Sequence, residues 1–192
     1  LREARSLEQT GDLLAALARY REALAQVAPV PRQLALSDAQ LRTAGELLHA
    51  VQSALAAAQA RARRAILVGP DWLAGPVVEA LSAKGFTAAM RPAGSEREAL
   101  DSARAQGVPW VIVLDAKTAA GGRIFSQMAA TASLDVRAVE ARSGAVAAAQ
   151  MKQGKGFGRT AEAAQQDAAQ QAARAAGIEL ADALVAKESA GL

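Results

Sequence analysis

The sequence predicts an α+β fold, in which an amino-terminal helical hairpin precedes a β-α-β-α-β-β-β-α domain with a mixed sheet. Residues 1–64 have helical periodicity, short apolar runs alternate with helical segments from residue 65, and two long strand-like segments precede an alanine-rich final helix. Strands separated by helices favour parallel pairing, whereas two consecutive long strands favour an antiparallel hairpin. We expect a two-layer or three-layer sandwich in residues 65–192, separate from the hairpin of residues 1–64.

The stretch "GDLLAALARYREAL", which begins at Gly11, resembles the second half of a tetratricopeptide repeat. Gly11 would turn the chain between two helices, and the small side chains of Ala16 and Ala23 would let those helices approach closely. A solenoid needs about three such repeats, so we expect a tetratricopeptide-like hairpin rather than an array; an ordinary alanine-rich hairpin fits equally well. A second helix is predicted to begin at Ser37, which has capping-box spacing to Gln40.

From residue 65 the pattern alternates between strands and helices. The predicted elements are a strand over 65–69, a helix over 72–84 that stops at Gly85, a weak strand "FTAAMR", a helix from the capping box Ser95/Glu98 to Gly107, and the strong strand "PWVIVLDA". The segment "KTAAGGR" is predicted to be a loop. Long strands over about 124–142 and 145–153, and a helix from about Thr160 to Lys187, complete the domain.

The two long strands suggest a register. A two-residue turn at Ser143-Gly144 would place Val136 opposite Met151 and Asp135 opposite Lys152. This pairing sets apolar residues against apolar ones on one face and acid against base on the other.

Three alternating glycines in "QGKGFGRT" precede the final helix. A helix amino terminus can bind an anion through backbone N–H groups, and Lys155, Arg159 and Thr160 would be the contact residues. The stretch lacks the phosphate-loop spacing G-x-x-x-x-G-K-[ST] and the context of a dinucleotide fingerprint. The favoured interpretation is structural: the glycines adopt positive φ while the chain turns from strand to helix, and Thr160 caps that helix.

Composition excludes several kinds of site. The chain has no cysteine, which excludes disulfides and thiolate metal ligands, and its single histidine, His49, lies in a helical run and is expected to be a surface or packing residue. The basic residues are scattered along the sequence, so we predict no nucleic-acid binding. No apolar run approaches the roughly 20 residues that span a bilayer. We predict no catalytic residue, cofactor or metal.

The strand "WVIVLDA", the segment "LDVRAVEARSGAV" and the helix "GKGFGRTAEAAQQDAAQQAARAAG" resemble the anticodon-binding-like domains of bacterial envelope proteins, the type found in CsgG, LpoB, FlgT and the amino-terminal domain of TolB. The resemblance covers about residues 65–187. It implies a non-enzymatic assembly or regulatory component that is periplasmic or associated with the outer membrane. Proteins of this type are often lipoproteins. Its partners would be other envelope proteins or further copies of itself, and any lipid anchor would lie before Leu1.

The sequence leaves two other functions open. A small-molecule or nucleotide-binding enzyme would use the ends of the first and third strands, with Asp71, Asp115 and Lys117 in a cleft. We favour instead a helix cap for Asp71 and a strand-end position for Asp115. The third function, nucleic-acid binding, is suggested by the anticodon-binding-like topology, but topology alone does not determine function.

Overall fold

The computed structural model describes residues 1–29, 38–91 and 94–190. It divides into two compact units, one formed by Leu1–Ala62 with the end of the chain from Glu188, the other by Arg63–Lys187.

The first unit contains helices α1 (Arg2–Gln9), α2 (Leu13–Val27) and α4 (Asp38–Ala62). Gly11 has φ 80° and turns the chain between α1 and α2, as the sequence predicts. Ala16, Leu17 and Tyr20 of α2 are buried in the apolar cluster of this unit. The predicted cap Ser37 lies outside the described residues.

The second unit has the predicted element order. Its elements are β1 (Arg64–Val68), α5 (Asp71–Ala83), β2 (Thr87–Arg91), α6 (Glu96–Gln106), β3 (Trp110–Ile124), β4 (Gln127–Glu140), β5 (Val146–Gly158) and α7 (Ala161–Ala190). The strands form one sheet in the order β2-β1-β3-β4-β5, parallel in the first three strands and antiparallel in the last three. The α+β class with a mixed sheet is confirmed.

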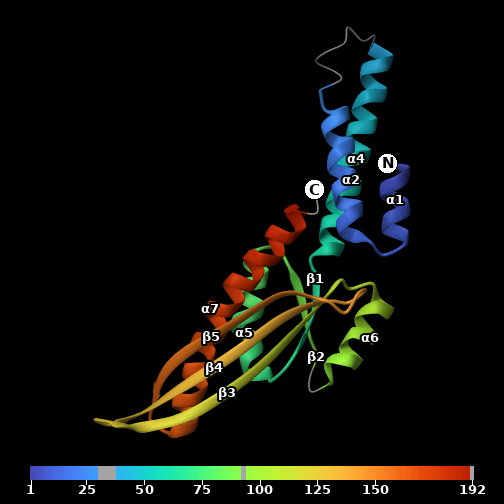
Figure 1. The fold of residues 1–192 in the computed structure, drawn as a ribbon. Coiled ribbons are helices and arrows are strands. Elements are labelled where there is room, and N and C mark those ends of the chain that lie inside the picture. Colours follow the sequence, from blue (N-terminus) through green and yellow to red (C-terminus); the bar gives the residue numbers. More distant parts are fainter. Residues whose placement is uncertain (30–37, 92–93, 191–192) are drawn as a thin grey trace. The chain divides into compact units, whose positions relative to one another are not determined.

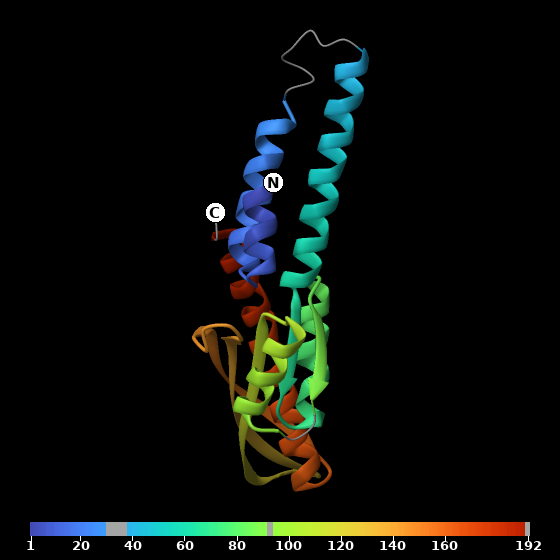
Figure 2. The ribbon, with the colours of Figure 1, turned by 90° about the vertical axis from the view of Figure 1, so that its right-hand side faces the viewer.

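Helices cover both faces of this sheet, so the second unit has three layers (Figures 1 and 2). On one face, Ala99 and Ala103 of α6 pack with Ile66 of β1 and Val111 of β3. Helices α5 and α7 lie against the opposite face and touch each other where Gly177 of α7 meets α5. The capping box of Ser95 and Glu98 and the left-handed Gly107 begin and end α6 as predicted.

Strand β3 is longer than predicted, because "KTAAGGR" is strand and not a loop. β3 pairs with β1 as far as Val113, and from Asp115 to Ile124 it pairs with β4. The three strands β3, β4 and β5 therefore continue beyond the parallel part of the sheet as an antiparallel ribbon, and Phe125 and Ser126 turn the chain at its end.

The predicted register of β4 and β5 is wrong by one residue. Asp135 lies opposite Met151, and Val136 lies opposite Gln150. The connection between the strands is residues 141–145 rather than a two-residue turn, with Gly144 at φ 72°, and a further irregularity separates Ala138 from the next pair. Lys152 consequently lies on the helix-covered face, where its Nζ is 2.6 Å from Glu179 Oε1 of α7, and not beside Asp135.

The alternating glycines of β5 do not turn the chain, as predicted, but make room for α7. Gly154, Gly156 and Gly158 lie within the strand and none has positive φ. A Cβ added to Gly154 or Gly156 would overlap backbone atoms of Ala168 in α7, and one on Gly158 would lie 2.6 Å from Ala164 N. These glycines are needed because α7 packs directly on the β5 backbone.

We expect Gly156→Ala to destabilise the second unit by about 3 kcal/mol, because the new methyl group must displace helix backbone rather than a side chain. Chemical denaturation of the variant and the wild type measures the difference. Gly122→Ala is the matched control: nothing lies within 4 Å of a Cβ at that position, so its free energy of unfolding should stay within about 0.5 kcal/mol of the wild type. Equal effects of the two substitutions would contradict the close packing.

Candidate functional site

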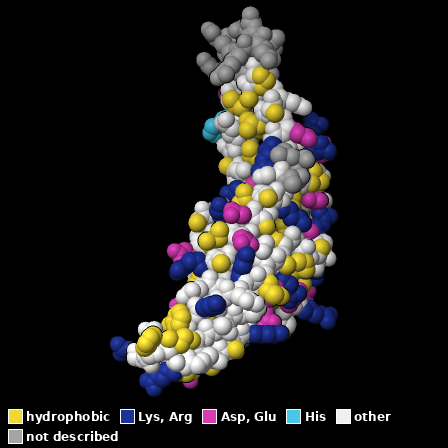
Figure 3. All heavy atoms as spheres, turned by 60° about the vertical axis from the view of Figure 1, so that its left-hand side comes forward, with side chains coloured by type: hydrophobic (Ala, Val, Ile, Leu, Met, Phe, Trp, Pro, Cys, Tyr) yellow, Lys and Arg dark blue, Asp and Glu magenta, His cyan; other side chains and the backbone are white. Residues whose placement is uncertain are grey.

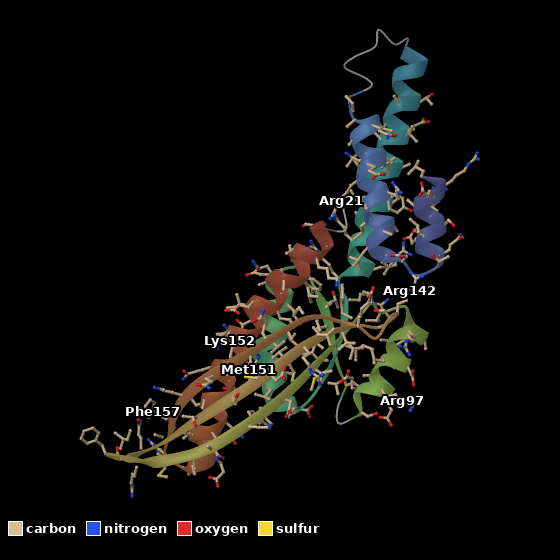
Figure 4. The ribbon with its side chains drawn as sticks, in the orientation of Figure 1. Arg21, Arg97, Arg142, Met151, Lys152 and Phe157 are labelled. Carbon is tan, nitrogen blue, oxygen red and sulfur yellow. The ribbon has the colours of Figure 1, made fainter. Side chains whose placement is uncertain are left out.

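The face of the ribbon opposite α7 is the principal candidate surface, and we call it the open face. It comprises Asp115, Lys117 and Ala119 of β3, Ala129, Thr131, Ser133 and Asp135 of β4, and Met151, Gln153, Lys155 and Phe157 of β5. Helix α6 borders it where Glu96 pairs with Arg137 at 3.3 Å. The side chains of β5 on this face are all exposed. Figure 4 labels Met151 and Phe157 along β5.

Large apolar side chains are exposed on and beside the open face. Met151 is 69% exposed, Phe157 is 50% exposed, and Phe125 at the end of the ribbon is 98% exposed, with Ile124 beside it. Figure 3 shows apolar side chains gathered at this end of the unit with Lys and Arg side chains on either side. An isolated exposed apolar residue such as Met151 is ordinary, but neighbouring exposed ones such as Ile124 and Phe125 indicate an interaction surface.

The ribbon also concentrates positive charge. Residues 117–134 and 142–161, which form most of it, contain six basic residues and neither aspartate nor glutamate; the basic residues are Lys117, Arg123, Arg142, Lys152, Lys155 and Arg159. Sequence reasoning treated these residues as scattered because they lie far apart along the chain. The antiparallel pairing of three strands brings Lys117, Arg123, Lys155 and Arg159 into the ribbon, whereas Arg142 lies in the connection at the other end of β5 and Lys152 is paired with Glu179. The absence of acidic residues from both segments was the signal that could have found this charge.

The three residues predicted to contact an anion, Lys155, Arg159 and Thr160, lie in three different parts of the strand-to-helix connection and its flanks. Thr160 caps α7, since its Oγ1 accepts a hydrogen bond from Ala163 N at 3.2 Å. Lys155 lies on the open face of β5, and Arg159 is exposed between strand and helix. The cap is confirmed, whereas anion binding by these three residues stays a prediction.

The outer edge of β5 presents backbone groups to solvent. Phe157 N donates a hydrogen bond to Asp167 Oδ2 of α7 at 3.1 Å, so its N–H points away from β4. In an antiparallel ladder alternate residues point the same way, and Met151, Gln153 and Lys155 therefore direct their backbone N–H and C=O groups to this edge. Asp167 covers the edge at Phe157.

The residues of the enzyme hypothesis do not form the expected strand-end cleft. Pro70 is the cap residue of α5 and Asp71 follows it without a side-chain capping bond, so the cap predicted for Asp71 is wrong. Asp115 lies within β3, opposite Asp135, and not at a strand end. His49 is exposed on α4. Among the described residues, no group of three or more His, Asp or Glu side chains is arranged to hold a metal ion.

The helical unit has an open hollow of about 400 Å³ between α1, α2 and α4, lined by Arg5, Glu8, Gln9, Tyr20, Ala54 and Arg61. Glu8 is the central group of this hollow: it accepts a hydrogen bond from Tyr20 Oη at 3.0 Å and forms an ion pair with Arg61. Nearby, a hydrogen bond to Glu22 and the negative charge of that residue raise the pKa of Arg19. The two contacts of Glu8 join α1 to α2 and α4.

Comparison with known proteins finds no matching family model and no matching curated protein. Similar solved structures include a candidate lipoprotein from Caulobacter crescentus, with 14% identity over 70% of this chain and 96% of that one and a TM-score of 0.42. The PelC dodecamer from Paraburkholderia phytofirmans has 16% identity over 64% of this chain and 86% of that one, with a TM-score of 0.43. A minor lipoprotein from Acinetobacter baumannii has 14% identity over 67% and 92%, with a TM-score of 0.34. At these identities and TM-scores the similarities are weak.

The observed register can be tested with a pair of introduced cysteines, because the chain has no cysteine of its own. Asp135 and Met151 are opposite residues whose backbone groups do not bond each other, a geometry with Cα atoms about 4.5 Å apart and within disulfide range. The double variant Asp135→Cys, Met151→Cys should therefore form an internal disulfide on mild oxidation, detected by intact mass. The control pair Asp135→Cys, Lys152→Cys places the thiols on opposite faces and should stay reduced. Disulfide formation in the control alone would restore the register predicted from the sequence.

Proposed function

We propose that this chain is a non-catalytic protein-interaction and assembly component of a bacterial cell envelope, and that it recruits a partner by adding a strand to the outer edge of β5. The observation that carries the proposal is this edge itself. β5 runs over Val146–Gly158, is the last strand of the sheet, and presents both unpaired backbone groups and exposed side chains over Met151–Lys155.

An added strand draws affinity from main-chain hydrogen bonds and specificity from the side chains that alternate along the edge. On the open face those side chains are the apolar Met151, the amide of Gln153 and the cation of Lys155, in that order along the strand. The fitting partner is an extended segment with an apolar residue that reaches Met151 and an acidic residue that reaches Lys155. Successive side chains of an added strand point to opposite faces. Because α7 lies on one face of β5, we expect small residues at the partner positions that face the helix and larger ones over the open face.

The envelope setting is supported by the resemblance of the strand and helix motifs to anticodon-binding-like envelope domains. A periplasmic position, association with the outer membrane and a lipid anchor outside this chain are parts of the same proposal. The tetratricopeptide-like helical unit would supply a second contact surface. The described helices include none with the combined length and apolarity to cross a bilayer.

The proposal predicts that proline at position 153 abolishes partner binding without unfolding the domain. Gln153 N–H points to the outer edge, so Gln153→Pro removes a group needed by an added strand and leaves the bonds to β4 in place. A photoreactive residue at Met151 should form one discrete cross-linked product in cells of the source organism. Gln153→Pro should reduce that product at least tenfold, and Gln153→Ala should leave it nearly unchanged.

Position 97 provides the spatial control, because Arg97 is exposed on α6 and away from β5 (Figure 4). A photoreactive residue there should give no product of the same mass. Cross-linking that persists in Gln153→Pro, or that is equal from positions 151 and 97, would refute recruitment by strand addition. Circular dichroism of each variant establishes that the fold is retained.

The location can be tested independently of the partner. Fractionation of cells that express the gene at its native level should recover the protein with the envelope rather than with the cytosol. Recovery in the cytosolic fraction together with a cytosolic marker enzyme would contradict the envelope setting, although it would leave strand addition at β5 to be judged by the cross-linking result.

A further inference from the structure

The end of the β3–β4 ribbon has an apolar tip. Phe125 is 98% exposed and Ile124 is 49% exposed, and Phe157 of β5, next to Ala129 of β4, adds a second aromatic ring with half of its surface exposed. Transfer of a large apolar side chain from water to an apolar medium is favourable. The tip therefore retains apolar surface that the folded chain itself leaves in water.

The backbone gives no local reason for an aromatic residue at this position. Phe125 has φ 54°, the one non-glycine residue with positive φ among the described residues. Glycine and asparagine accept this left-handed conformation easily, whereas a bulky residue is disfavoured in it. Both the exposure and the backbone conformation disfavour phenylalanine here, which favours a contact of this side chain outside the chain.

Positive charge lies directly behind the tip. Arg123 precedes Ile124, and Lys117, Lys155 and Arg159 are exposed along the same ribbon. No aspartate or glutamate lies in residues 117–134 or 142–161. An apolar end followed by basic residues matches the order of a bilayer surface, in which anionic headgroups lie outside the acyl chains.

We propose that this tip binds the surface of an anionic lipid bilayer peripherally. Phe125 and Ile124 enter the boundary between headgroups and acyl chains, and Arg123 and Arg159 contact the anionic headgroups. The exposed aliphatic side chain of Ile124 favours lipid over single-stranded nucleic acid, which is bound by stacking on aromatic rings and by cations. The binding surface is the ribbon end, distinct from the β5 edge over Met151–Lys155, so this inference does not rest on the proposed function.

Vesicle co-sedimentation of the whole chain tests the proposal. We expect binding to vesicles of phosphatidylglycerol and phosphatidylcholine in equal parts, little binding to pure phosphatidylcholine, and weaker binding at high salt. Phe125→Gly should reduce the partition coefficient at least tenfold. Because glycine relieves the left-handed backbone, the same variant should unfold at the same or a higher denaturant concentration, so lost binding cannot be attributed to lost folding.

Charge and position have their own matched variants. Arg123→Glu should reduce binding at least fivefold, since each basic residue near an anionic surface contributes about that factor. Arg97→Glu on α6 makes the same charge change away from the tip, and Val146→Ser removes a 53% exposed apolar side chain at the other end of β5. Both controls should bind within twofold of the wild type. Equal losses in the controls and in the tip variants would overturn the proposal.

A fluorescent label locates the contact, because one introduced cysteine is the sole labelling site. An environment-sensitive dye on Ser126→Cys should shift to the blue when phosphatidylglycerol vesicles are added, and the dye on Arg97→Cys should not. Absence of a shift at position 126, an equal shift at both positions, a shift produced by a single-stranded oligonucleotide, or a shift that depends on protein concentration without vesicles would each overturn lipid binding at the tip.

Discussion

The close packing of α7 on the backbone of β5 is the constraint on which the second unit depends. Gly154, Gly156 and Gly158 lie on the face that α7 covers, opposite small residues of the helix. Two strand residues advance about 6.6 Å and four helical residues about 6 Å, so glycine at every second strand position can match alanine at every fourth helical position. Ala164, Ala168 and the next alanine of that row, Ala172, are buried accordingly.

This packing separates the chemistry of the two faces of the ribbon. A side chain larger than hydrogen has no room beneath α7 at the end of β5, so the larger side chains of this strand are restricted to the opposite face. Met151 and Phe157 are consequently exposed although both are apolar. Earlier in β5, where the glycines have not yet begun, the helix-covered face still accepts the long side chain of Lys152, which forms an ion pair with Glu179. The candidate surface is thus a consequence of how the helix is held.

The order and type of the elements could be predicted because each depends on local signals. The capping box of Ser95 and Glu98, the helix stop at Gly107 and the cap at Thr160 are determined by residues a few positions apart. The register of β5 could not be predicted in the same way, because it depends on the length of the connection after Glu140 and on an irregularity in the ladder. Nothing in the composition of residues 141–145 distinguishes a two-residue turn from the longer connection that forms.

The glycines had a recognisable but ambiguous pattern. In a turn, glycine is required because it can adopt a positive φ. In β5, glycine is required because it has no side chain. A glycine in the sequence does not show which of the two reasons applies. The alternation of Gly154, Gly156 and Gly158 with period two was evidence for a strand, and the alanines after Thr160 with period four were the complementary half of the contact. Together, the two-residue period of the glycines and the four-residue period of the alanines predict that the glycines pack beneath the helix.

A shift of one residue in β5 decides which surface the protein offers. In the register predicted from the sequence, Met151 would share the face of Val136 and be buried, and Lys152 would neutralise Asp135 at the surface. In the observed register, placing the glycines beneath α7 necessarily turns Met151, Gln153, Lys155 and Phe157 outward, because neighbouring strand residues point to opposite faces. Those four residues carry both the exposed edge and the second aromatic ring beside the tip. The contact that closes the core on one side of β5 therefore also determines the residues that the other side presents to a partner or a membrane.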